Sequence, residues 1–436
     1  MASVKPIFAT LADTCGRIET YNITILFYII GYCLCAAAQS FGVYVTGYFF
    51  YIIGQSGTNL LNNIIASDFS SVKWRAFAIQ SVYSPVIFMP FVSGFILDNV
   101  VGGIGWRWGI GMFAIIMPLG VSLLIFMAFY LQYRTQKPEF FPWKISSTYG
   151  FYKNVDIVGI ILISGGTALL LCPISWVGVF QDRWNVPWVY VLVGVGALML
   201  GAAYVYEKQF TSRPFIPVNY FTDRTILLTC LLILLDRIAF WVTHVYMYVW
   251  LVVTHNFSAQ NALYVTYINT SFQYLAGLAT GWAIRQRCRY KWGSVTGSVI
   301  RCIGYGLMLR LRGSNVGMTE LLLVQIVQGL GTGMMESSNL VAAQVFIPRA
   351  ALAKVTSLWY LCGYVGSSIG SCIAGGIYVG QLKERLKYHL GSNANEVQVD
   401  LYYDAVLAAL PPWGTDERIG VNDAVSSHPH LQIMLS

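Results

Sequence analysis

Charged residues are scarce in this sequence. Only 11% of its 436 residues are Asp, Glu, Lys or Arg, whereas soluble globular domains carry about 25%. At the same time 56% of the residues are hydrophobic, and the mean hydropathy is +0.60. A soluble domain of this length needs far more polar surface. The composition therefore excludes that class and places the chain in a lipid bilayer.

The sequence also lacks the residue sets that catalysis and metal binding require. Its nine cysteines follow neither a disulfide framework nor a metal-ligand spacing. We find no nucleophile paired with a base, no glycine-rich phosphate loop and no cluster of metal ligands. We therefore predict that the chain is not an enzyme, and that it has no cofactor and no fixed metal site.

Long apolar runs are what the sequence has in abundance. Eleven of them are long enough to cross the hydrocarbon core of a bilayer, which is about 30 Å thick. Because lipid offers no hydrogen bonds to an open backbone, each run should be helical. We predict an all-α membrane protein with spans at 19–38, 42–66, 77–97, 107–131, 157–177, 187–206, 225–252, 264–284, 292–310, 318–337 and 355–379.

The net charge of +8 is explained by membrane topology. Basic residues concentrate in the loops on one side of the predicted spans, including the dense stretch RQRCRYK at 285–291. This asymmetry is the positive-inside pattern of membrane proteins. It gives little support to a nucleic-acid partner, and we predict none.

A motif close to the start of the sequence points to a family. In LADTCGR, residues 11–17, Leu11, Asp13, Gly16 and Arg17 have the spacing of a tight cytoplasmic turn. The motif resembles the signature loop between the second and third spans of the major facilitator superfamily, a large group of membrane carriers. Longer blocks narrow the resemblance to the fungal siderophore–iron transporters of that superfamily. These blocks are ETYNITILFYIIGYCLCAAAQSF, IIASDFSSVKWRAF, GWRWGIGMFAIIMP and PPWGTDER.

The resemblance implies the major facilitator fold with fourteen spans, of which this chain would hold about eleven. Matched motif to motif, the run 19–38 becomes the third span and 355–379 the thirteenth, so we expect a chain truncated at both ends. The implied divisions are 1–131, an incomplete N-terminal bundle (spans three to six with a remnant of span two); 132–156, a cytoplasmic central loop; 157–206, an extra helix pair (spans seven and eight); 207–379, a C-terminal bundle (spans nine to thirteen); and 380–436, an extracellular loop with a divergent tail.

The same resemblance implies a conformational gate on the cytoplasmic side. Asp13 and Arg17 would latch the two halves while the carrier faces outward, and Gly16 would make the tight turn. Asp68 and Arg75 occupy the usual partner positions on the next inner loop. The alternative is that these are ordinary loop charges set by topology.

Three predicted spans, 42–66, 225–252 and 318–337, carry polar residues along one helical face. Matched to the family resembled, they would be spans four, nine and twelve, which line the central cavity of that fold. Polar groups at bilayer depth are costly unless they face an interior path. The alternative is that they only hydrogen-bond one helix to another. The predicted substrate pathway consists of Gln55, Asn59, Asn62, Phe240, His244, Gln325 and Thr332.

Two carboxylates within the spans are candidates for proton coupling, Asp236 and Glu336, with Arg237 and Arg301 as basic residues near them. A proton bound by one of the carboxylates could couple substrate movement to the proton gradient. We favour Asp236, because it lies deeper in its span. The alternative is a purely structural buried ion pair.

The segment 380–436 follows the last predicted span. Leu382, Leu386 and Leu390 recur every four residues and predict a short amphipathic helix. In the family resembled, a long outer loop between the last two spans caps the cavity and helps to capture the ferric chelate. The alternative is packing of its aromatic residues on the membrane surface. The candidate capture residues are Tyr402, Tyr403 and Trp413.

These features predict a proton-coupled importer of ferric siderophore chelates that works by alternating access. Its partners would be the ferric siderophore, protons and the lipid bilayer, and we expect a monomer in the plasma membrane or in endosomal vesicles. Two alternatives keep the fold, a proton-coupled exporter and a glutathione–proton exchanger. A further alternative is a truncated, transport-inactive product that only binds.

Overall fold

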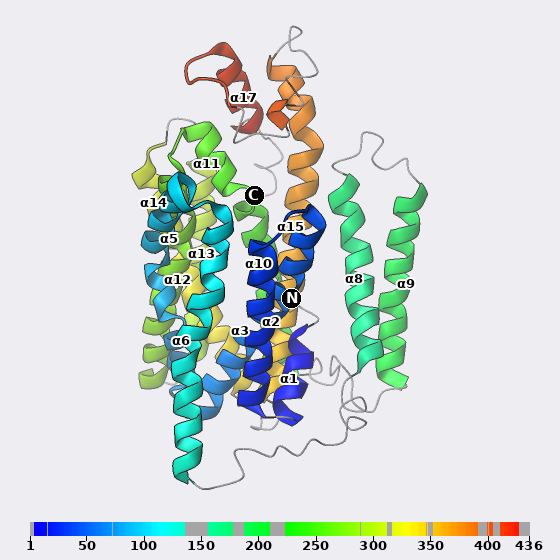
Figure 1. The fold of residues 1–436 in the computed structure, drawn as a ribbon, viewed down its shortest axis with the longest axis vertical. Helices are drawn as coiled ribbons and strands as arrows, with labels where there is room; N and C mark the ends of the chain where they lie inside the picture. Colours follow the sequence, from blue (N-terminus) through cyan, green and yellow to red (C-terminus); the bar gives the residue numbers. More distant parts are fainter. Residues whose placement is uncertain are drawn as a thin grey trace.

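The computed structural model describes residues 4–14, 16–71, 73–135, 156–177, 187–209, 223–287, 289–311, 316–345, 347, 352–390, 399, 401–403 and 410–426. Within these ranges the regular elements are helices, and no strand is present. Figure 1 shows the long helices running side by side, with the end of α15 and α17 projecting at the top. The predicted all-α class is confirmed.

The helices follow the apolar runs of the sequence. Each predicted run coincides with one helix or with consecutive helices. The elements before the central loop are α1 (Val4–Thr14), α2 (Arg17–Ala36), α3 (Phe41–Phe69), α4 (Arg75–Val82), the 3-10 turn η1 (Ser84–Phe88), α5 (Met89–Asn99), the π turn η2 (Val100–Ile104) and α6 (Trp106–Thr135). Those after it are α8 (Ile157–Val177), α9 (Pro187–Gln209), α10 (Arg224–His244), α11 (Met247–His255), α12 (Ala259–Arg287), α13 (Tyr290–Arg310), α14 (Met318–Gln344), α15 (Leu352–Leu390) and α17 (Asp416–Ser426).

The structure divides two of the predicted runs. The run 77–97 bends by 48° between α4 and the segment formed by η1 and α5. Pro85 and Pro90 lie at the starts of η1 and α5, where a proline removes a backbone donor and interrupts the helical ladder. The run 225–252 divides into α10 and α11 around Tyr246.

Five of the described helices are long and apolar enough to cross a membrane, or six if the bent α4–α5 pair counts as one span. The count is taken over the described residues, and the apolar part of α8 counted there, Val158–Pro173, is too short to be included. In α14, by contrast, most residues, including its glutamines and Glu336, are buried. A helix of this kind faces protein and not lipid, so its average hydropathy is low.

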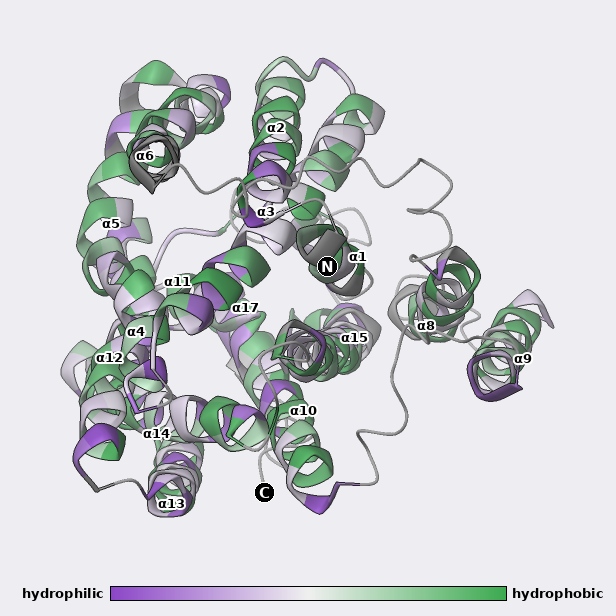
Figure 2. Ribbon diagram, turned by 90° about the horizontal axis from the view of Figure 1, so that it is seen from below, coloured by the Kyte–Doolittle hydropathy of each residue, from purple (hydrophilic) through white to green (hydrophobic). Residues whose placement is uncertain are grey.

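The helices form two groups that meet along two seams. In the first group α2 packs against α3 and α6; in the second, α10 packs against α15, and α14 packs against α12 and α13. Across the groups, α12 lies against α4 and α5, and α1 lies against α15. Figure 2 shows α8 beside α15 and α9 farther out. The domain boundaries stay a prediction, and most of the predicted central loop, 136–155, lies outside the described residues.

The end of α15 forms part of an outer core. The short helix predicted around Leu390 is not separate, because α15 continues without a break through that residue. Leu382 and Leu386 are almost fully buried against Val421 and Ala424 of α17. The core also includes residues of α11, such as Leu251. Burial of these leucines explains their spacing and holds α17 onto the helical body.

Glycines allow α12 and α14 to approach closely. A Cβ atom on Gly333 would lie 2.0 Å from the backbone oxygen of Gln273, and one on Gly329 would lie 2.3 Å from that of Asn269. Small residues at helix crossings permit such backbone contact within membranes. The contact also brings Gln273 of α12 next to the neighbouring turn of α14.

We predict that Gly333→Ala destabilises the protein. The added Cβ would force α12 and α14 apart, and overpacking of this kind costs about 1–3 kcal/mol. The midpoint of thermal unfolding in detergent should fall. Gly306→Ala is the matched control, because a Cβ there meets nothing within 4 Å. Equal midpoints for the two variants would contradict the close helix contact.

Candidate functional site

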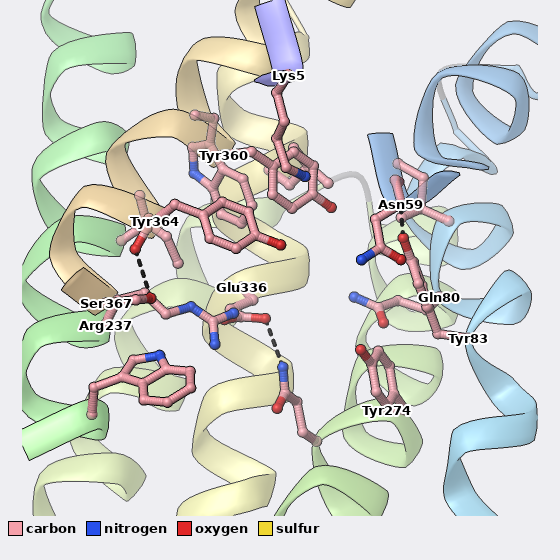
Figure 3. Close-up of a pocket in the computed structure, with 17 residues that line it drawn as sticks. Lys5, Asn59, Gln80, Tyr83, Arg237, Tyr274, Glu336, Tyr360, Tyr364 and Ser367 are labelled. Atoms are coloured by element: carbon pink, nitrogen blue, oxygen red, sulfur yellow. Dashed lines mark hydrogen bonds and ion pairs between the residues drawn. The ribbon is translucent and has the colours of Figure 1, made fainter. Parts of the chain in front are cut away.

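A cavity of about 280 Å³ lies where the two helix groups meet. Its walls come from α1, α3 and α4 on one side and from α10, α12, α14 and α15 on the other. Figure 3 shows the labelled side chains converging on this space. The described lining residues are Lys5, Asn59, Ile79, Gln80, Tyr83, Ile233, Arg237, Trp241, Gln273, Tyr274, Glu336, Leu340, Trp359, Tyr360, Gly363, Tyr364 and Ser367.

An ion pair between Arg237 of α10 and Glu336 of α14 forms part of the cavity wall. The side-chain amide of Gln273 on α12 donates a further hydrogen bond to the Glu336 carboxylate at 2.7 Å. Glu336 is only 9% exposed, so these donors stabilise its charge in place of water. The carboxylate therefore joins three helices of the second group.

The preceding residue on α10, Asp236, forms a separate ion pair with Arg301 of α13. Their side chains are 6% and 4% exposed, and neither residue lines the cavity. Successive residues of a helix point about 100° apart, which is why Asp236 and Arg237 reach different helices. Of the two candidate carboxylates, the structure therefore places Glu336 in the cavity wall, although the sequence led us to favour Asp236.

Asn59 of α3 lies on the opposite wall, beside a pair of tyrosines. The hydroxyl of Tyr83 donates to the backbone oxygen of Asn59 at 3.1 Å and accepts a hydrogen bond from the amide of Asn63 at 2.7 Å. The Tyr83 ring stacks on that of Tyr274, with 5.4 Å between ring centroids. Of the predicted pathway residues, Asn59 alone is among the described lining residues.

Phe240, His244 and Gln325 form a second polar cluster. The Nε2 atom of His244 lies 3.0 Å from the Oε1 atom of Gln325, which also accepts a hydrogen bond from Asn269 at 3.2 Å. The rings of Phe240 and His244 stack with centroids 4.1 Å apart. His244 lies seven residues beyond Arg237, or about 10 Å along the helix axis. This cluster is therefore a buried polar contact, separate from the cavity.

The other three predicted pathway residues also lie outside the cavity wall. Asn62 accepts a hydrogen bond from the hydroxyl of Tyr21 at 3.0 Å, which joins α3 to α2. Thr332 donates to the backbone oxygen of Gln328 at 2.8 Å within α14. Gln55 is half-buried on α3. The contact of Asn62 fits the alternative in which polar side chains hydrogen-bond one helix to another, whereas that of Thr332 stays within its own helix.

Arg17 and Asp68 form an ion pair. Arg17 is the first residue of α2 and Asp68 is near the end of α3, so the pair lies at the end of these helices that is far from the short loop connecting them. The Nε atom of Arg17 lies 3.2 Å from the Oδ2 atom of Asp68, and both side chains are about one-third exposed. Gly16 precedes α2 with φ of 112°, a conformation that favours glycine. Arg75 is buried at the start of α4. The side chain of Asp13 lies outside the described residues.

The predicted capture residues lie at the outer end of the molecule, apart from the cavity. Tyr402 and Tyr403 pack on the outer core, and the hydroxyl of Tyr402 donates to Glu417 at 3.1 Å. Loss of hydration raises the pKa of Tyr402, as does this hydrogen bond. Trp413 is exposed, with the Arg418 guanidinium 5.1 Å from its ring. Arg418 also donates to the backbone oxygen of Val253, which joins α17 to α11.

Several lining residues were not predicted from the sequence. Lys5 lies in a segment that we interpreted only as the remnant of a span. Tyr360 and Tyr364 of α15 are separated by four residues, the spacing of one helical face, and this signal was available in the sequence. Gln80 and Gln273 belong to spans that showed no polar stripe as clear as the three we selected.

Comparisons with known proteins support a transport function. Residues 2–318 match the family described as fungal trichothecene efflux pump (TRI12). The chain is 30% identical over 441 residues to the low affinity heme transporter str3 of Schizosaccharomyces pombe, and the aligned region covers 97% of this chain and 69% of that protein. It is 28% identical over 443 residues to siderophore iron transporter 1 of the same organism, and that aligned region covers 100% of this chain and 71% of the relative.

Solved structures show the fold. The human organic anion transporter MFSD10 superposes with a TM-score of 0.54 at 12% identity, covering 100% of this chain and 80% of that one. A peptide transporter, POT, superposes with a TM-score of 0.52 at 15% identity, covering 99% of this chain and 83% of that one. At these identities the likeness extends to the arrangement of helices and not to the cargo.

We predict that removal of one partner of the cavity ion pair destabilises the protein more than removal of both. Arg237→Met leaves the Glu336 carboxylate buried without its cation, which costs about 3–5 kcal/mol. The double variant Arg237→Met with Glu336→Leu removes both charges and should recover most of this loss. Unfolding in detergent measures the effect, with Arg310→Met at an exposed position of α13 as control. A double variant no more stable than the single one would contradict the pairing.

Proposed function

Because the chain belongs to the fungal siderophore–iron transporter family of the major facilitator superfamily, we propose that it imports ferric siderophore chelates by proton-coupled alternating access. It is an all-α, multi-pass membrane transporter with the major facilitator fold. Iron enters this proposal as part of the cargo. We also propose that the protein is a monomer and that it lies in the plasma membrane or in endosomal vesicles.

The observation that carries the proposal is the cavity between the two helix groups. Side chains from both groups face this one space. If the groups rock about it, a bound chelate meets first one side of the membrane and then the other. The seams that would have to open are those of α12 with α4 and α5, and of α1 with α15.

Glu336 is our candidate for the proton-coupling residue. Its carboxylate is buried in the cavity wall and holds both Arg237 and Gln273. Protonation would remove its negative charge and so release Arg237 from the ion pair. A free Arg237 could then bind the cargo or change the packing of α10 against α14. Asp236 would act only indirectly, through its pair with Arg301 on the far side of α10.

Uptake of a ferric siderophore labelled with radioactive iron tests the proposal. In yeast cells without siderophore carriers of their own, the wild-type chain should raise uptake above the empty vector, and more strongly in acidic medium. Glu336→Gln should abolish the stimulation by acid. Glu320→Gln, an exposed carboxylate on the same helix, should keep it. Vector-level uptake with the protein present in the membrane would contradict the proposal.

Export is the second candidate function, and the description of the matched family as an efflux pump favours it. Heme is a second candidate cargo, because the relative str3 is named a heme transporter. The same cells can separate the directions. Cells preloaded with a labelled chelate should lose it no faster than vector controls if the carrier imports, and faster if it exports.

The ion pair between Arg17 and Asp68 gives a test of the gate. We propose that it stabilises one conformation of the carrier, together with Asp13 and Arg75. Arg17→Asp alone places two acids together and should reduce uptake at least about tenfold, because like charges at this distance repel. Adding Asp68→Arg restores an opposite pair and should recover part of the uptake. A double variant as inactive as the single one, at equal membrane abundance, would contradict a role for the pair.

A further inference from the structure

Lys5 of α1 is a buried cation in the cavity wall. Its side chain is fully buried, and its Nζ atom has no hydrogen-bond partner among the described residues. Figure 3 shows it extending from α1 toward the ring of Tyr360. A buried ammonium group without a hydrogen-bonded partner is unfavourable, so its presence requires an explanation.

Aromatic rings are the contacts of the Lys5 ammonium group. The Nζ atom lies 4.0 Å from the ring centroid of Tyr360 and 4.8 Å from that of Tyr364. Both tyrosines lie on α15, one helical turn apart. Cation–π contacts stabilise a positive charge but do not neutralise it. An anion that enters the cavity and displaces these rings would therefore meet a cation with no acidic partner among the described residues.

The charges in the described cavity wall do not balance. Lys5 and Arg237 are basic, and Glu336 is the acidic residue. Glu336 is already held by Arg237 and by Gln273, which leaves Lys5 as the positive charge in excess. A ligand with a negatively charged oxygen would compensate it, and a charge-assisted hydrogen bond would form in a site shielded from water.

The size and walls of the cavity indicate what kind of group enters. Its volume of about 280 Å³ is below the range of about 300–1,000 Å³ that is usual for sites of drug-sized ligands. It fits an arm of a bulky chelate better than the whole of one. The side chains of Trp241 and Trp359 also line the cavity and supply flat apolar surface.

We propose that Lys5 binds a carboxylate carried by the iron chelate, so that the site selects anionic chelates over neutral ones of the same shape. This inference rests on the proposed function, since it names the class of chelate that the cavity accepts. Two sources supply such a group, a carboxylate on a siderophore and a propionate of heme. Both would place a negatively charged oxygen against the ammonium group in the same way.

Binding of matched acids and esters to the purified 436-residue chain in nanodiscs tests the proposal. One pair is a ferric trihydroxamate with free carboxylates and its methyl ester; the other is hemin and its dimethyl ester. In at least one pair the affinity for the acid should be at least about tenfold higher than the affinity for the ester. Preference in the first pair alone identifies the siderophore carboxylate, and preference in the second alone identifies the propionate.

Three variants assign the preference to Lys5. Lys5→Gln should reduce the ratio of acid to ester affinity to about one while the affinity for the ester stays unchanged. Lys5→Arg keeps the charge and should keep the preference. Lys208→Gln is the matched control, because Lys208 also lies near a tyrosine ring, at 5.8 Å from Tyr204, but is exposed on α9. It should bind as the wild type does.

Two results would overturn the proposal about Lys5 but would not contradict the proposed transport function. One is equal binding of acid and ester by the wild type in both pairs, and the other is a preference that persists in Lys5→Gln. Failure of all four compounds to bind would instead contradict the proposed function itself, and the anion site with it.

Discussion

Two ion pairs that start from neighbouring residues of α10, each with a buried carboxylate, constrain the rest of this structure. Asp236 reaches Arg301 on α13, and Arg237 reaches Glu336 on α14. Charges removed from water are tolerated only when paired with good geometry, so the three helices must keep their positions. The close contact of α14 with α12 then brings Gln273 to Glu336. The cavity wall is a consequence of this arrangement.

The cavity, the inner ion pair and the outer core occupy three separate levels of the molecule. Arg17 and Asp68 are partly exposed, whereas Lys5 and Glu336 in the cavity wall are buried and the outer core is apolar. Partly exposed pairs contribute little to stability, so the pair can break and form as the protein changes shape. The buried pairs are costly to break singly. The described structure therefore has a partly exposed ion pair at one end of α2 and α3 and buried charged groups at its centre.

The sequence predicted the helices better than the helical faces and the contacts between them. Apolar runs locate helices because lipid demands them. The polar stripes lie on α3, α10 and α14, which all contribute to the cavity wall, but Asn59 is the one predicted pathway residue among its described lining residues. Which acid meets which base depends on helix rotation and crossing, so Asp236 could not be distinguished from Glu336. The place of Lys5 in the cavity wall was missed because a single cation in a short segment carries no pattern. The break near Pro85 had a visible signal, while the one near Tyr246 has no proline or glycine to mark it.

The position of iron in the loaded protein is the most direct test of this account. Crystals grown with a ferric siderophore can be measured at the iron absorption edge, where anomalous scattering locates the metal without reference to the protein. The account predicts a peak next to the cavity bounded by Arg237, Glu336 and Tyr360, because an arm of the chelate enters it. A peak found only at the outer segment near Tyr402 and Trp413, with none next to the cavity, would contradict it.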